Sequence, residues 1–78
     1  MIIKTQDNPG IMQGMFIFEN SEGIVSRKGT AGETVSILTG NDQYVLGIYG
    51  SKERAAQVQE QIAGSFTGSE KIYQMPAE

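Results

Sequence analysis

The sequence contains no cysteine, histidine or tryptophan. Without cysteine, disulfides and thiolate chemistry are excluded, and without histidine the chain lacks the side chain that most often transfers protons near neutral pH. Zinc sites are built mainly from Cys and His, so a conventional zinc centre is excluded as well. A nucleophilic triad has no base to place between its nucleophile and its orienting acid. We therefore expect a protein that is not an enzyme, with no catalytic residues, no bound metal and no cofactor.

The chain also has no large excess of charge of either sign and no long apolar run. Six basic residues against nine acidic residues give a net charge of −3, so we do not expect direct binding to nucleic acid. Lys4 follows the apolar start of the chain at once, which is not typical of a signal peptide. No stretch approaches the roughly 18 apolar residues of a membrane span, so no contact with a membrane is expected. These absences favour a cytoplasmic location.

The 78 residues include ten glycines and two prolines, which is typical of one small domain that is rich in turns. Short apolar stretches between polar turn clusters predict strands, and one later stretch has helical spacing. We therefore expect an α+β domain over residues 1–78, with a mostly antiparallel sheet or a small barrel and one helix before the last strand. The strands are expected at residues 2–6, 13–19, 24–27, 33–39, 43–49 and 71–75.

The helix is predicted to begin after Ser51. This serine is a suitable N-cap, because its hydroxyl can accept from the free N–H groups of the first turn. Glu53 lies in that turn, where the helix dipole favours negative charge. Gly64 is expected to end the helix in a left-handed conformation after about twelve residues. The apolar stripe that should contact the sheet consists of Ala55, Val58 and Ile62.

The strands carry apolar residues on both faces, which one short helix cannot cover. In the strand before the helix, alternation places Leu46 and Tyr49 on opposite faces. In the second strand, it places two phenylalanines opposite Met15 and Ile17. Either the sheet closes into a barrel around its own side chains, or a second copy of the chain covers the open face as a homo-oligomer. The residues alone leave both alternatives open.

Two segments combine cations with groups that can bind an anion. Arg27 and Lys28 lie in a glycine-rich stretch whose backbone N–H groups would be free for a phosphate. At the helix start, Ser51, Lys52 and Arg54 combine free N–H groups and positive charge with the positive end of the helix dipole. The first segment also has a simpler interpretation, as a turn with solvated cations. The second has one as well, as an ordinary helix cap. If the two segments meet in space, they would form a phosphate-binding site.

Tyrosines offer a further kind of contact. Tyr44 and Tyr49 could stack on the base of a nucleotide or anchor a partner protein. The alternative is that both are half-buried packing residues of a small sheet. The residues that we predict to bind a ligand are therefore Arg27, Lys28, Ser51, Arg54, Tyr44 and Tyr49.

Three segments, at residues 1–7, 45–55 and 73–76, resemble a recurrent layout. The chain is similar to a family of small uncharacterised proteins from Gram-positive bacteria, their phages and integrated elements. Those proteins open with an MIIxxQD strand, carry an LGxYxSxERAxxVxxxI strand–helix junction and end in YxMP. The stretches at 12–14 and 27–32 depart from that layout, so the resemblance does not extend to the first cationic segment.

The resembled family has no assigned activity, so the resemblance implies a mobile-element origin in a host cytoplasm and transfers no catalytic residue. Small phage accessory proteins commonly act by stoichiometric binding, and the analogy extends that expectation to this chain. One such role is an antagonist of host immunity that sequesters a phosphate-bearing nucleotide signal as a homo-oligomer. The alternatives are a protein that inhibits a host defence enzyme or nuclease by direct contact, and a structural or assembly protein of the element.

Overall fold

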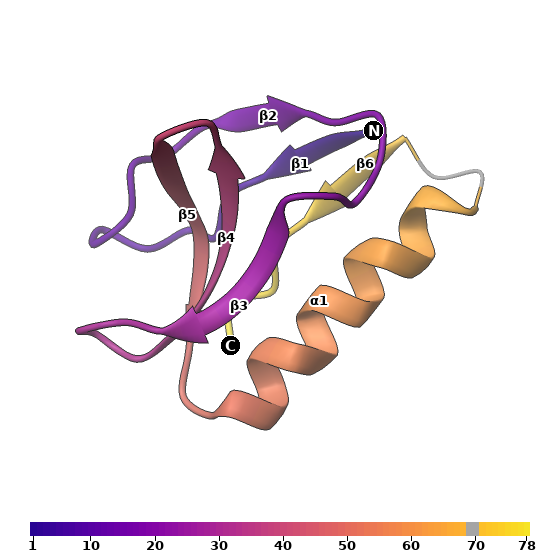
Figure 1. Ribbon diagram of the computed structural model, residues 1–78. Coiled ribbons are helices and arrows are strands. Elements are labelled where there is room, and N and C mark those ends of the chain that lie inside the picture. The colour runs from indigo at the N-terminus through magenta and orange to yellow at the C-terminus, as the bar shows by residue number, and fades with distance from the viewer. Residues whose placement is uncertain (69–70) are drawn as a thin grey trace.

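The computed structural model describes residues 1–68 and 71–78. Within them, strands and a helix follow one another in the expected order, which confirms the α+β class (Figure 1). The strands form two three-stranded sheets that stay open, so no barrel closes among these residues. The elements are β1 (Ile2–Lys4), β2 (Met15–Ile17), β3 (Ile24–Lys28), β4 (Glu33–Thr39), β5 (Asp42–Tyr49), α1 (Lys52–Phe66) and β6 (Ile72–Gln74).

The first sheet, in the order β3-β4-β5, is antiparallel throughout. Gly40 forms the tight turn between β4 and β5 with a φ of 59°, which glycine adopts without steric cost. Between Val35 and Ser36 the register with β5 shifts at a β-bulge. The shift corrects one expectation. Leu46 and Tyr49 do not lie on opposite faces but are buried in the same core, because the bulge interrupts the alternation of β5.

The second sheet has the order β2-β1-β6, and each of its strands is shorter than predicted. β2 pairs antiparallel with β1, whereas β6 pairs parallel with β1. A parallel pair needs a crossover connection, and α1, at the lower right of Figure 1, is part of the connection that leads to β6. The two sheets are joined where the Gln6 N–H donates to the Leu46 carbonyl oxygen at 2.8 Å.

The helix α1 begins as predicted and ends later. Ser51 is its N-cap, since the Ser51 Oγ accepts from the Arg54 N–H at 3.1 Å. The helix continues through Gly64 to Phe66, and Thr67 caps it in a right-handed conformation. The prediction that Gly64 ends the helix in a left-handed conformation is therefore wrong. The half-buried Phe66 side chain packs against the core, and this burial outweighs the helix cost of about 1 kcal/mol for one glycine.

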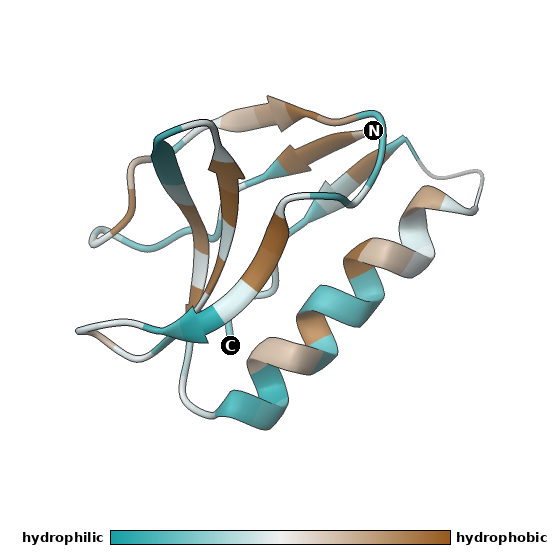
Figure 2. Cartoon of the chain, viewed as in Figure 1, coloured by the Kyte–Doolittle hydropathy of each residue, from teal (hydrophilic) through white to brown (hydrophobic). Residues whose placement is uncertain are grey.

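The core lies between α1 and the sheets. The predicted helix stripe is confirmed, because Ala55, Val58 and Ile62 are each at most 1% exposed. Figure 2 shows the same division, with apolar residues along the strands and polar residues on much of the helix surface. No helix in the described residues is long and apolar enough to cross a membrane. The sheet side of the core consists of Ile3, Phe18, Ile24, Val35, Ile37, Leu46, Tyr49 and Met75.

One polar side chain is buried where the sheets join. Gln6 is 1% exposed, and its Nε2 donates to the carbonyl oxygens of Ile48, Pro76 and Ala77 at 3.0, 3.1 and 2.8 Å. Its Oε1 accepts from the Ile48 N–H at 2.9 Å. Burial of an amide is tolerated when its donors and acceptor are all bonded. Gln6 thus connects the end of β1, the end of β5 and the C-terminal segment 75–78.

Candidate functional site

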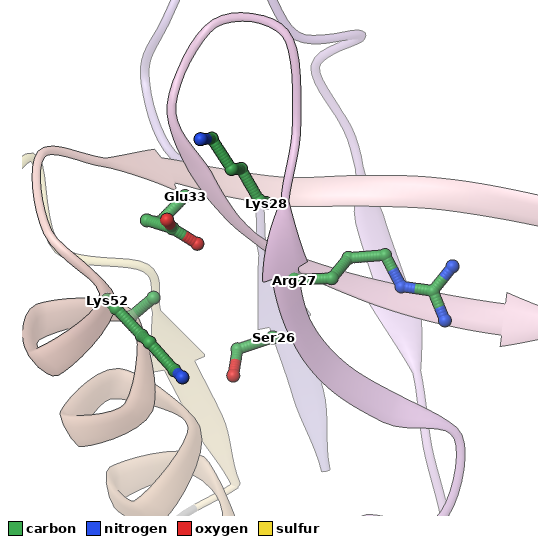
Figure 3. Close-up of a pocket in the computed structure, with 6 residues that line it drawn as sticks. Ser26, Arg27, Lys28, Glu33 and Lys52 are labelled. Carbon is green, nitrogen blue, oxygen red and sulfur yellow. The ribbon is translucent and has the colours of Figure 1, made fainter.

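The end of β3 and the start of α1 meet around a hollow of about 390 Å³, which we call the basic hollow (Figure 3). The two predicted cationic segments therefore approach each other in space, although they are separated in sequence by β4 and β5. One contributes Lys28 and the other Lys52. The residues that line the basic hollow are Ser26, Arg27, Lys28, Glu33, Lys52 and Ala55.

Local structure explains how the strand side of the basic hollow forms. Lys28 and Glu33 are paired across the β3–β4 hairpin. The loop between them is closed by a hydrogen bond from the Gly29 N–H to the Gly32 carbonyl oxygen at 2.8 Å. Gly32 has a φ of 142°, a backbone conformation that residues with a side chain rarely adopt. The hairpin therefore presents one cation and one anion side by side, and Lys52 at the first turn of α1 adds a second cation.

The side chains in the basic hollow do not all point the same way. In Figure 3 the Glu33 carboxylate lies between Lys28 and Lys52, and the Lys52 amine extends toward the Ser26 hydroxyl. Arg27 points away, because successive residues of a strand face opposite sides. Two ammonium groups against one carboxylate leave a single net positive charge. This arrangement can bind a small anion through charge-assisted hydrogen bonds, with Glu33 weakening the attraction.

Arg54, predicted as a phosphate ligand, is directed to the C-terminal segment. Its Nε donates to the Glu78 carbonyl oxygen at 2.8 Å, and its Nη1 donates to the Gln57 Oε1 at 2.6 Å. The guanidinium carbon also lies 6.0 Å from the centre of the Tyr49 ring, within the range of a cation–π contact. Arg54 does not line the basic hollow.

Replacing Ser51 with alanine should lower the free energy of unfolding by about 1 kcal/mol, because the N-cap hydrogen bond to the Arg54 N–H is lost. Urea denaturation measures this change. Ser65→Ala, in the last turn of α1, is the matched control and should be near neutral, since the Ser65 hydroxyl only donates to the Gln61 carbonyl oxygen within the helix. Unchanged stability combined with weaker phosphate binding would show that Ser51 is a ligand rather than a cap.

Tyr49 is buried at 3% exposure and its hydroxyl donates to the Pro76 carbonyl oxygen at 3.0 Å. Gly47 makes room for this ring, because a Cβ at position 47 would lie 2.6 Å from the Tyr49 hydroxyl oxygen. The pKa of Tyr49 is raised to about 12, mainly by burial and also by the nearby Tyr73, while the Arg54 cation acts in the opposite direction. With its ring enclosed and its hydroxyl bonded, Tyr49 supports the fold and offers no free face to a base.

Tyr44 lies elsewhere on the surface. It is 38% exposed, and its ring centre is 5.7 Å from that of Phe16. It borders a second hollow of about 280 Å³ with mostly apolar walls, which also include Ile11 and Met12. None of the residues that line this second hollow also lines the basic hollow. The predicted set of six ligand residues is thus divided among three places on the fold.

The sequence prediction omitted Ser26, Glu33 and Lys52 from the ligand-binding set. Lys52 had a visible signal as a cation at the helix start. Glu33 could have been found from the hairpin, since a glycine-rich loop after Lys28 predicts that the residue resuming the strand pairs with it. Among the described residues, no group of three or more His, Cys, Asp or Glu side chains could hold a metal ion. Compared with known proteins, the chain matches no family model, no curated protein and no solved structure.

Proposed function

We propose that the protein acts by stoichiometric binding, without turnover, and that the basic hollow holds a small phosphate-bearing ligand. The observation that supports this proposal is the meeting of Lys28 and Lys52 in one hollow, beside the Ser26 hydroxyl. Ammonium groups and hydroxyls are ordinary ligands of phosphate oxygens. Lys52 also stands at the N-terminus of a 15-residue helix, where the helix dipole favours negative charge.

The size and charge of the basic hollow favour a small ligand. Its volume of about 390 Å³ lies at the lower end of the range for small-molecule sites. One net positive charge suits a single phosphate group better than a polyanion. The hollow has no aromatic side chain in its lining, so the phosphate and not the base would carry the recognition. We therefore expect nucleotides with different bases to bind with similar affinity.

The biological role that we propose rests on the resemblance and on analogy. A mobile-element accessory protein with such a site would sequester a phosphate-bearing signal of host immunity in the host cytoplasm. Sequestration requires no catalytic group, only affinity and enough copies of the protein. The two alternatives, an inhibitor that contacts a host enzyme and an assembly protein of the element, predict no dependence on the lysines of the basic hollow.

Thermal-shift measurements with inorganic pyrophosphate, cyclic dinucleotides and ADP-ribose test the proposal. A ligand at 100 times its Kd should stabilise the fold by about 2.7 kcal/mol. Lys28→Ala and Lys52→Ala should each weaken binding roughly tenfold, because each removes a charged donor. Lys71→Ala removes the same charge from an exposed site outside the basic hollow and is the matched control. Glu33→Gln should strengthen binding roughly fivefold, because it removes the repulsion of the carboxylate.

Two outcomes would contradict this function. The first is the absence of stabilisation by every phosphate compound in the panel. The second is an equal loss of affinity in Lys71→Ala and Lys52→Ala, which would show a non-specific charge effect. A host protein captured equally by the wild type and by the Lys28→Ala, Lys52→Ala double variant would favour the inhibitor alternative.

A further inference from the structure

The basic hollow contains side chains that donate hydrogen bonds and one that only accepts them. Lys28 and Lys52 carry ammonium groups, which donate, whereas the Glu33 carboxylate accepts. The Ser26 hydroxyl can do both. Within residues 1–68 and 71–78, none of these four side chains makes a hydrogen bond or an ion pair. Their polar atoms are therefore available to a ligand.

A bare phosphate would use only part of this set. Phosphate oxygens accept from the two ammonium groups and from the Ser26 hydroxyl. The Glu33 carboxylate lies between Lys28 and Lys52 in Figure 3, so a phosphate bound by both lysines would face a carboxylate that repels it. A ligand that carries a hydrogen-bond donor beside its phosphate would bond the carboxylate as well. The lining of the basic hollow thus favours phosphate compounds that have such a donor.

The charges around Glu33 favour a neutral donor over a cationic one. A ligand ammonium bonded to Glu33 would also lie near the ammonium groups of Lys28 and Lys52, and like charges repel. A hydroxyl carries no net charge, and its hydrogen bond to a carboxylate is of the short, charge-assisted kind. In dinucleotide-binding folds an acidic side chain accepts from a ribose hydroxyl in the same way. Hydroxyls therefore match the carboxylate better than an amine does.

We propose that the ligand of the basic hollow is a sugar phosphate, whose phosphate binds the two lysines and whose hydroxyls donate to Glu33. This inference rests on the proposed function, because it concerns the same phosphate site. The volume of about 390 Å³ suits one phosphate group with one sugar. No aromatic side chain lines the hollow, so a base attached to the sugar is not required for recognition.

Isothermal titration calorimetry with ribose 5-phosphate and propyl phosphate tests the hydroxyl contacts. Both compounds carry a phosphate monoester, and only the first carries hydroxyls. We expect the wild type to bind ribose 5-phosphate roughly tenfold more tightly, which is typical of one hydrogen bond to a charged group. Lys52→Ala should weaken the binding of both compounds to a similar degree, because it removes a donor to the phosphate that they share.

Two substitutions separate the charge of Glu33 from its hydrogen bond. Glu33→Gln removes the repulsion and keeps an acceptor oxygen, so it should bind both compounds more tightly and keep a roughly threefold preference for ribose 5-phosphate. Glu33→Met also removes the acceptor, so it should bind propyl phosphate more tightly and lose the preference. Glu60→Met, at an exposed acid of α1 outside the basic hollow, is the matched control and should keep the full preference. Circular dichroism should show that all variants are folded.

The outcomes distinguish this inference from the proposed function. Equal affinity of the wild type for the two compounds overturns the inference, and the phosphate site stands if binding still depends on Lys52. A full preference that survives in Glu33→Met overturns it as well, because another group would then bind the hydroxyls. Tighter binding of phosphoethanolamine than of ribose 5-phosphate overturns it in favour of an ammonium donor. Absence of binding by every compound, inorganic pyrophosphate included, contradicts the proposed function and this inference with it.

Discussion

Replacing Gln6 with alanine should lower the free energy of unfolding by about 3 to 4 kcal/mol, the largest effect that we expect for one substitution. The melting temperature of a domain of this size should then fall by about 15 to 25 °C. Two costs add. The shortened side chain leaves a cavity at a site that is only 1% exposed. It also removes the acceptor of the Ile48 N–H and the donor to three carbonyl oxygens.

Gln13 offers a matched control for this prediction. Its Nε2 also donates to three carbonyl oxygens, those of Gln6, Asn8 and Ile11, but its side chain is exposed. Water can replace these bonds, so Gln13→Ala should cost less than about 1 kcal/mol. Urea denaturation of both variants measures the contrast. Equal costs would show that burial of the Gln6 amide is not what makes it important.

Alkaline pH should destabilise the protein through Tyr49. Burial raises the pKa of this tyrosine from its ordinary value of 10.0 to about 12 in the folded protein. Between these values the unfolded chain loses the phenolic proton first, so the folded state binds more protons. The contribution of Tyr49 to the free energy of unfolding is therefore fully present below pH 10 and is lost as the pH rises toward 12. Two pKa units correspond to a loss of up to about 2.7 kcal/mol.

Tyr49→Phe isolates this contribution. The variant keeps the buried ring and loses the hydrogen bond to the Pro76 carbonyl oxygen, so it should be about 1 kcal/mol less stable at neutral pH. Its stability should then decline less steeply between pH 10 and 12 than that of the wild type. Tyr44→Phe, at an exposed tyrosine, should keep the steep decline. Parallel curves for Tyr49→Phe and the wild type would refute the assignment of the decline to Tyr49.

The two predictions concern the same part of the molecule. Gln6 and Tyr49 both donate to the Pro76 carbonyl oxygen, and Arg54 donates to the Glu78 carbonyl oxygen. These contacts join the end of β1, the end of β5 and the start of α1 to the C-terminal segment 75–78.

Local patterns predicted the elements because their causes are local. The Ser51 cap and the stripe ending at Ile62 depend on residues within a turn or two of the helix. The same reasoning failed at Gly64, because the helix is extended by packing of Phe66 against the core. It failed at Leu46 as well, because the bulge that brings this residue into the core arises in the pairing with β4. Both errors come from contacts between elements.

For the candidate site, the sequence located the cationic segments and could not orient them. Lys28 and Lys52 meet, while Arg27 points away because of strand alternation (Figure 3). Arg54 was expected to join them and instead bonds the Glu78 carbonyl oxygen, 24 residues along the chain. A side chain with several potential partners takes the one that the topology brings closest, and topology is not visible in a local pattern.

The sequence by itself excluded cysteine and histidine chemistry and determined the order of the elements, because residue type and short-range spacing are properties of the chain. Only the tertiary structure decided which groups meet. In the folded protein the Gln6 amide donates to a carbonyl oxygen 71 residues away, the Tyr49 ring packs over Gly47, and Ile17 and Ile72 stay exposed. These outcomes depend on the parallel pairing of β1 with β6 through α1, which brings the two ends of the chain together.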